Sequence, residues 1–176
     1  MAKKIIAILM SMSLLFILCA CGSNGNDGAK EEQSGNETNT QINEVETTEA
    51  TVDLKKVYDD CVALMPEMTV LDADMMYDFC GINPEDCAES YVAVCADSLR
   101  ADEIWIIKAK DADALKRIEE AAKNRLQAKD EESISYSPEQ NKVVKAAKTI
   151  VIGEYFGLLV SPDVDALANV CYNAAK

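Results

Sequence analysis

The chain has 176 residues, of which 17 are basic and 31 are acidic, so its formal net charge is −14. A surface this negative repels phosphate backbones and anionic lipid headgroups, which argues against nucleic-acid partners and against electrostatic adhesion to membranes. The chain contains no histidine, which excludes Ser-His-Asp and Cys-His catalysis and His-ligated zinc. Any enzymatic activity would have to use carboxylates, lysine, tyrosine, cysteine or an oxygen-bound metal.

Residues 1–20 have the pattern of a lipoprotein signal peptide. Two lysines precede an apolar run that ends at Leu18, and its length of about 14 residues is short of the roughly 20 that a membrane-spanning helix needs. The run leads into Leu18–Cys21 (LCAC), which resembles the lipobox of bacterial lipoproteins. We therefore predict cleavage before Cys21 and attachment of a diacylglyceryl group to its thiol. The alternative is a permanent membrane anchor.

Cleavage would leave a still more acidic protein. It removes the two lysines and no acid, so 15 basic and 31 acidic side chains give a net charge of −16. Because an anionic bilayer repels such a surface, membrane attachment depends on the acyl chains of Cys21, which contribute about 0.8 kcal/mol per buried methylene. The predicted location is the cell membrane, lipid-anchored, on the extracellular face.

Residues 21–51 are predicted to form the lipidated cysteine and a disordered acidic tether. The segment is rich in Gly, Asn, Ser, Thr and Glu and has no helical or strand period. Such a segment cannot bury enough apolar surface to offset the entropy lost on ordering. A coil of about 30 residues averages roughly 30 Å between its ends, so the domain should stay near the bilayer.

Residues 52–176 are predicted to form a single domain that begins with two helices. Apolar residues recur at three- and four-residue steps from Leu54 to Met65, and Pro66 ends this helix. A second helix covers Asp72–Phe79 and ends at Gly81. Its predicted inward-facing residues are Met75, Met76 and Phe79.

Four strands in two hairpins follow. Glu89–Ala96 and Glu103–Ala109 are joined by a short link, and Thr149–Ile152 and Tyr155–Val160 flank a Gly-Glu turn. Between and after the hairpins, capping signals predict three more helices, which begin near Asp111, Ser137 and Ser161-Pro162. We therefore predict an α+β fold: a two-layer domain of about four mostly antiparallel strands packed against helices.

Four stretches resemble an uncharacterised family of lipoproteins from Gram-positive bacteria, whose C-terminal region is classed as a domain of unknown function (the DUF4358-type family). They are Tyr77–Pro84, Ala101–Ala112, Tyr136–Gln140 and Gly153–Ser161. With the lipobox and the tether, the resemblance spans nearly the whole chain. Because the family has no established activity, the resemblance implies no functional residue in this chain.

Five cysteines remain in the domain: Cys61, Cys80, Cys87, Cys95 and Cys171. A metal or redox site formed by the middle three would lack the C-x-x-C pairs and the histidine that are usual in zinc sites. A Cys80–Cys87 disulfide would close a small loop, as exported domains often do. The third interpretation is that all five are free, because Cys61 and Cys171 lie on apolar helix stripes and Cys95 lies in a strand.

The remaining candidates are carboxylates and one aromatic residue. Acidic pairs such as Glu119-Glu120 could act as general acid and base or bind calcium, but no EF-hand spacing is present and helix capping or chance explains most pairs. Trp105 is the only tryptophan. It is either a core residue or, if Ile104 and Ile106 point inward, an exposed binding surface. The sequence indicates no cofactor, no metal and no catalytic residue.

Three classes of function remain open. The first is a non-enzymatic accessory or binding module of the cell envelope, favoured by the missing histidine and the absence of a catalytic motif in the sequence. The second is an envelope enzyme that uses carboxylates or a thiol on wall or peptide substrates. The third is a structural spacer. The sequence leaves the protein or envelope partner unidentified.

Overall fold

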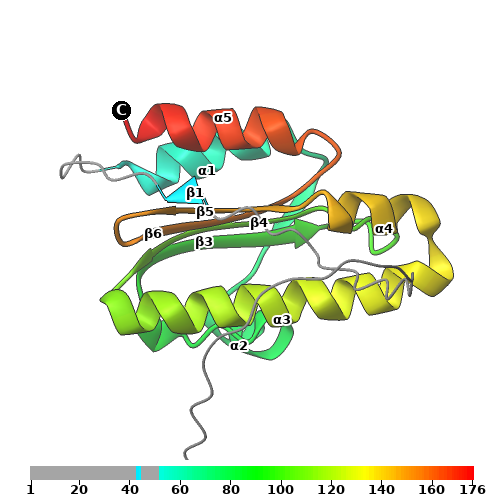
Figure 1. Cartoon of the computed structure of the whole chain (residues 1–176), viewed down its shortest axis with the longest axis horizontal. Helices are drawn as coiled ribbons and strands as arrows, with labels where there is room; N and C mark the ends of the chain where they lie inside the picture. The colour runs from blue at the N-terminus through cyan, green and yellow to red at the C-terminus, as the bar shows by residue number, and fades with distance from the viewer. Residues whose placement is uncertain (1–42, 45–51) are drawn as a thin grey trace, which may run out of the picture. The chain divides into compact units, whose positions relative to one another are not determined.

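A computed structural model describes residues 43–44 and 52–176 (Figure 1). The predicted signal peptide, Cys21 and most of the predicted tether lie outside these residues. The elements follow the chain in the order β1 (Asn43–Glu44), α1 (Leu54–Val62), β2 (Met68–Val70), α2 (Ala73–Cys80), the one-turn helix η1 (Pro84–Asp86), β3 (Cys87–Cys95), β4 (Glu103–Ala109), α3 (Ala112–Tyr136), α4 (Pro138–Lys145), β5 (Lys148–Ile152), β6 (Tyr155–Val160) and α5 (Val164–Ala174).

The strands form one sheet in the order β1-β5-β6-β4-β3-β2. All neighbours are antiparallel except β1 and β5, which are parallel. Both predicted hairpins are present: β3 pairs with β4, and β5 pairs with β6. The α+β class is therefore confirmed. The sheet has two strands more than predicted. The sequence pattern missed β1 and β2 because they are only two and three residues long, too short to show a period.

Helices cover both faces of the sheet (Figure 1). Trp105 and Ile107 of β4 belong to a core that also holds residues of α2, α3 and α4. Ile104 and Ile106 of the same strand belong to a second core, with residues of α1 and α5. The domain therefore has three layers where the sequence predicts two. Central strands that are apolar on both faces require a covering layer on each side.

Local signals set the helix ends as the sequence predicts. Asp111 caps α3, because its Oδ1 accepts hydrogen bonds from the amides of Asp113 and Ala114 at 3.0 and 2.8 Å. Ser137 caps α4 through the amide of Gln140. Gly81 ends α2 in the left-handed region at φ 70°, a conformation that glycine adopts without a Cβ clash.

The buried face of α2 differs from the prediction. Met76 and Cys80 are buried, but Met75 and Phe79, which the sequence predicts to face inward, are 41% and 61% exposed. Residues four apart lie on the same side of a helix, so Met76 and Cys80 share one side while Met75 and Phe79 share the next. Only the first side packs against the core.

The short strand β1 comes from the segment predicted to be a disordered tether. Asn43 and Glu44 pair with Ile150 and Val151 of β5. Within the part of the chain that the structure describes, no helix combines the length and the apolar composition that crossing a membrane requires.

Candidate functional site

A groove of about 530 Å³ lies between α3, the end of α4 and the β5–β6 hairpin, and we call it the α3–β5 groove. Its volume is in the range of sites that hold small molecules or peptide side chains. The apolar residues that line it are Leu126, Val144, Val151 and Phe156. The polar and charged ones are Lys116, Glu119, Glu120, Lys123, Gln127, Asp130, Lys145 and Thr149.

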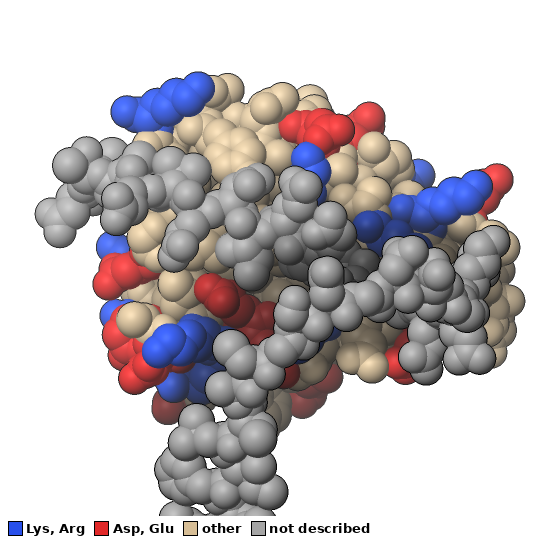
Figure 2. Space-filling model, viewed as in Figure 1, with Lys and Arg blue, Asp and Glu red and all other residues tan. Residues whose placement is uncertain are grey.

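The charged wall of the groove comes from one side of α3. Lys116, Glu119, Glu120 and Lys123 recur at three- and four-residue steps, which places them on one helix side. With Asp130 and Lys145, the described lining contains three lysines and three acids. Acidic and basic side chains are also interspersed around the first turns of α3 in Figure 2. The wall is therefore close to neutral although the whole chain is strongly acidic.

Polar contacts between α3 and α4 fix one end of the groove. The side-chain amide of Asn141 donates to Asp130 Oδ1 at 2.6 Å and to Ser133 Oγ at 3.1 Å. Lys145 Nζ lies 3.7 Å from the same Asp130 oxygen. Asn141 is buried, so these hydrogen bonds satisfy a group that would otherwise destabilise the fold.

Beneath α3, a buried ion cluster centres on Glu103 at the start of β4. The carboxylate is fully buried and accepts hydrogen bonds from Arg125 Nη2 at 2.9 Å and from Lys129 Nζ at 2.7 Å. Trp105 Nε1 donates to Glu103 Oε1 at 2.8 Å, and Cys80 Sγ lies 3.8 Å from that oxygen. We call these five residues the Glu103 cluster.

The two cations keep Glu103 ionised. Burial alone would raise the pKa of Glu103, but the charges of Lys129 and Arg125 and their hydrogen bonds outweigh it, so the pKa lies below its ordinary value. A second, more exposed pair joins the first part of α3 to η1, where Arg117 contacts both oxygens of Asp86 at 2.6 and 2.9 Å. Ion pairs therefore hold α3 to the sheet side of the domain at two places along its length.

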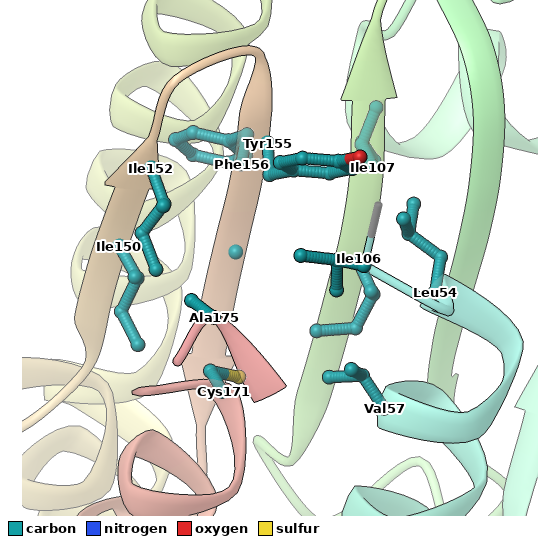
Figure 3. A pocket seen from close by; sticks show the side chains of 12 residues that line it. Leu54, Val57, Ile106, Ile107, Ile150, Ile152, Tyr155, Phe156, Cys171 and Ala175 are labelled. Carbon is teal, nitrogen blue, oxygen red and sulfur yellow. The ribbon is translucent and has the colours of Figure 1, made fainter. Parts of the chain in front are cut away.

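The opposite face of the sheet contains a much smaller cavity (Figure 3). Its volume is about 40 Å³, and isoleucines of β4 and β5 line it together with residues of α1 and α5. A space of this size holds at most one or two waters, and its walls offer few polar partners. The cavity is therefore a packing defect rather than a ligand site, and the α3–β5 groove is the better candidate.

Of the sequence-predicted candidates, the acidic pair Glu119-Glu120 lies in the groove, whereas Trp105 does not. Trp105 is fully buried in the Glu103 cluster, so the exposed binding surface considered for it is not formed. The reason is that α3 covers the face of β4 that carries this side chain. Cys21 lies outside the described residues.

The Cys80–Cys87 disulfide is also not formed. Both thiols are free, and they contact different acceptors: Cys80 contacts Glu103, and Cys87 contacts the carbonyl oxygen of Asn83. Burial raises the pKa of Cys80 to about 12 and the pKa of Cys87 to about 11. Both therefore remain protonated at neutral pH and are poor nucleophiles. Within the described residues, no group of three acidic or cysteine side chains is arranged to hold a metal ion.

Sequence reasoning missed the Glu103 cluster. Glu103, Trp105 and Ile107 are alternate residues of one strand, so their side chains lie on the same face of the sheet. If that face is known to be covered by a helix, a buried carboxylate at Glu103 follows. Arg125 and Lys129 lie 22 and 26 residues further along the chain, and no local pattern connects them to Glu103. Their four-residue spacing on one side of α3 is the only signal that the sequence offers for the two cations.

Residues 60–161 match the family described as a domain of unknown function (DUF4358). The match covers more than half of the chain, and the chain belongs to this family. Comparison with curated proteins and with solved structures finds no significant match.

Proposed function

We propose that the protein is a lipid-anchored extracytoplasmic lipoprotein whose domain is a non-enzymatic binding module of the cell envelope. The α3–β5 groove is its proposed ligand-binding surface. The observation that carries this proposal is a groove of about 530 Å³ with apolar and charged lining residues from two helices and two strands. Ligand sites commonly combine an apolar lining with a few polar groups that fix orientation.

The lining suits a polypeptide segment of an envelope protein. Leu126 and Val151 are half-buried and offer apolar contacts. The lysines of the same lining donate hydrogen bonds and its acids accept them. Because the groove wall carries equal numbers of lysines and acids, it does not favour a highly charged ligand. The neighbouring edge of β5 pairs with a backbone segment at Asn43–Glu44, which indicates that extended chain fits beside the groove.

The chemistry of the interior supports binding over catalysis. A carboxylic acid that donates a proton near neutral pH needs a raised pKa, whereas the pKa of Glu103 is lowered by Lys129 and Arg125 against the effect of burial, and hydrogen bonds from Arg117 lower the pKa of Asp86. A nucleophilic cysteine needs a lowered pKa, whereas burial raises the pKa of Cys80 to about 12. In the groove, the acids left to an envelope enzyme are Glu119, Glu120 and Asp130.

The proposed anchoring rests on the lipobox-like pattern at Leu18–Cys21. It is tested by Cys21→Ser, with Cys19→Ser as the matched control. In cells supplied with a fatty-acid probe, the wild type and Cys19→Ser should be processed, labelled and recovered with membranes. Cys21→Ser should remain unlabelled and uncut. Normal processing of Cys21→Ser would contradict the anchor without bearing on the groove.

The proposed binding surface is tested by filling the groove. Thr149 of β5 is half-buried in its lining, and Ala166 of α5 is exposed on the opposite side of the sheet. After extraction with a mild detergent, the wild type and Ala166→Trp should elute in a complex larger than the chain alone. Thr149→Trp should elute alone. Elution of the wild type alone, or complexes that survive Thr149→Trp, would contradict the groove as the binding surface.

A further inference from the structure

Two cysteines of the layer opposite α3 lie against each other. Cys61 of α1 is fully buried and Cys171 of α5 is 9% exposed. Cys61 Sγ lies 3.9 Å from the carbonyl oxygen of Leu167, which is one helical turn before Cys171. Helical side chains lean toward the turn that precedes them, so the contact at Leu167 places the Cys61 sulfur beside the Cys171 side chain.

Both thiols are free, and each affects the pKa of the other. The neighbouring Cys171 thiol, followed by burial, raises the pKa of Cys61, and the neighbouring Cys61 thiol lowers the pKa of Cys171. In Figure 3 the sulfur of Cys171 points toward α1, where Val57 lies one turn before Cys61. The small cavity beside Cys171 leaves room for its side chain to adjust. Cys80 and Cys87 contact Glu103 and the carbonyl oxygen of Asn83, and neither contact lies beside another cysteine.

We propose that Cys61 and Cys171 form a disulfide that joins α1 to α5 when the chain folds in the presence of a disulfide oxidant. This site goes beyond the proposed function and does not depend on the groove. The oxidant is a small-molecule disulfide or the disulfide of a dithiol oxidoreductase, as oxidising compartments outside the cytoplasm supply.

The reaction proceeds by two exchanges. The Cys171 thiolate attacks one sulfur of the oxidant, forms a mixed disulfide and releases one thiolate. Cys61 then loses its proton to solvent and attacks Cys171 Sγ, which forms the protein disulfide and releases the second thiolate. Two protein thiols are oxidised and one disulfide is reduced to two thiols. The first step also removes the negative charge of the Cys171 thiolate, which would otherwise oppose ionisation of Cys61.

The disulfide would connect the first and the last helix of the domain, which are far apart along the chain but packed together in the fold. A bridge across about 110 residues restricts the unfolded chain strongly, so the melting temperature of the oxidised protein should rise by roughly 10 °C. A Cys80–Cys87 bridge would close a far shorter loop and would raise the melting temperature less.

The test is to refold the full chain, in detergent, with oxidised and reduced glutathione. Trypsin and cleavage at methionine separate Cys61, in the peptide Val57–Met65, from the other cysteines, and Cys171 lies alone in Thr149–Lys176. Mass spectrometry should find these two peptides linked, and two fewer thiols should be alkylated in denaturant. The oxidised protein should melt at the higher temperature.

Variants separate the disulfide from general effects on folding. Cys171→Ala should abolish the linked peptide and the rise in melting temperature, while the control variant with Cys80→Ala and Cys87→Ala should keep both. Because Cys171→Ala could destabilise the fold, the thiol count of the wild type is the independent measurement. Five alkylated domain thiols after oxidising refolding, or linkage of Cys61 or Cys171 to another cysteine, would overturn the proposal.

Discussion

The two faces of the sheet are both covered by helices, but the cores beneath those helices differ in their charge and packing. Under α3, the core includes a fully buried carboxylate with two cations, and the outer side of the helix borders a large groove. Under α1 and α5, the core is made of isoleucine, leucine, valine and cysteine side chains around a cavity of about 40 Å³. One face thus combines buried charge with a ligand-sized groove, and the other is an apolar core with a small cavity.

The difference indicates how the groove is positioned. Apolar contacts tolerate small shifts of a helix. The buried Glu103 carboxylate, in contrast, keeps all its hydrogen bonds only where Arg125, Lys129 and Trp105 are within reach at the same time. Buried ion pairs add little net stability compared with apolar packing but can specify a unique arrangement. We infer that the Glu103 cluster sets the position of α3 along the sheet, and therefore the width of the α3–β5 groove.

Glu103→Gln should produce the largest loss of stability. It leaves Arg125 and Lys129 partly buried without their counter-charge, which costs about 3–5 kcal/mol in the free energy of unfolding. Urea denaturation followed by fluorescence measures this loss, because Trp105 is the only tryptophan and contacts Glu103 directly. Asp59→Asn, in the exposed Lys55–Asp59 pair, is the control and should change little. Equal effects of the two variants would contradict a special role of the cluster.

Leu167→Ala should have a somewhat smaller effect on the opposite face. Leu167 is fully buried, and its truncation leaves a cavity that costs about 3 kcal/mol. Unlike Glu103→Gln, this variant should leave the groove unchanged, so binding of a partner by the folded protein should match the wild type. A loss of binding by folded Leu167→Ala would show that the faces are coupled.

The pH dependence of stability should differ between a variant of the α3 face, Glu103→Gln, and a variant of the α1–α5 face, Leu167→Ala. The pKa of Glu103 is lower in the folded chain than its unfolded value, because Lys129 and Arg125 outweigh burial. Its contribution is therefore complete above about pH 5 and is lost as the pH falls below the unfolded pKa of about 4.3 toward the folded pKa. The stability difference between the wild type and Glu103→Gln should shrink in acid. The difference for Leu167→Ala should stay constant over the same range.

Gly81→Ala should have the smallest effect and should leave the charges of the α3 face unchanged. Gly81 has φ 70°, and a Cβ at this position would meet no atom within 4 Å. The cost is therefore backbone strain alone, about 1 kcal/mol. Gly81→Asn should cost less, because asparagine tolerates this conformation better. Thermal denaturation of both variants measures the difference, and an equal or larger loss for asparagine would contradict the backbone explanation.

The sequence predicted what local signals encode. Capping residues such as Asp111 and Ser137 located helices. The turn at Gly153 located the second hairpin, and the short link between Glu89–Ala96 and Glu103–Ala109 located the first. The third layer was also encoded, because the run Ile104–Ile107 contains no polar residue, which is typical of a strand covered on both faces. The α3–β5 groove was not predictable, because it depends on the distance between α3 and β5, which tertiary packing decides.

The central claim is that the chain binds its partner through the α3–β5 groove rather than through the α1–α5 face. A photo-reactive amino acid at Lys123, on the groove wall, and another at Asn169, exposed on α5, would compare the two faces in the native host. Illumination should give a covalent adduct from position 123 that Thr149→Trp removes, and no such adduct from position 169. An adduct from position 169 alone, or equal adducts from both positions, would contradict the claim.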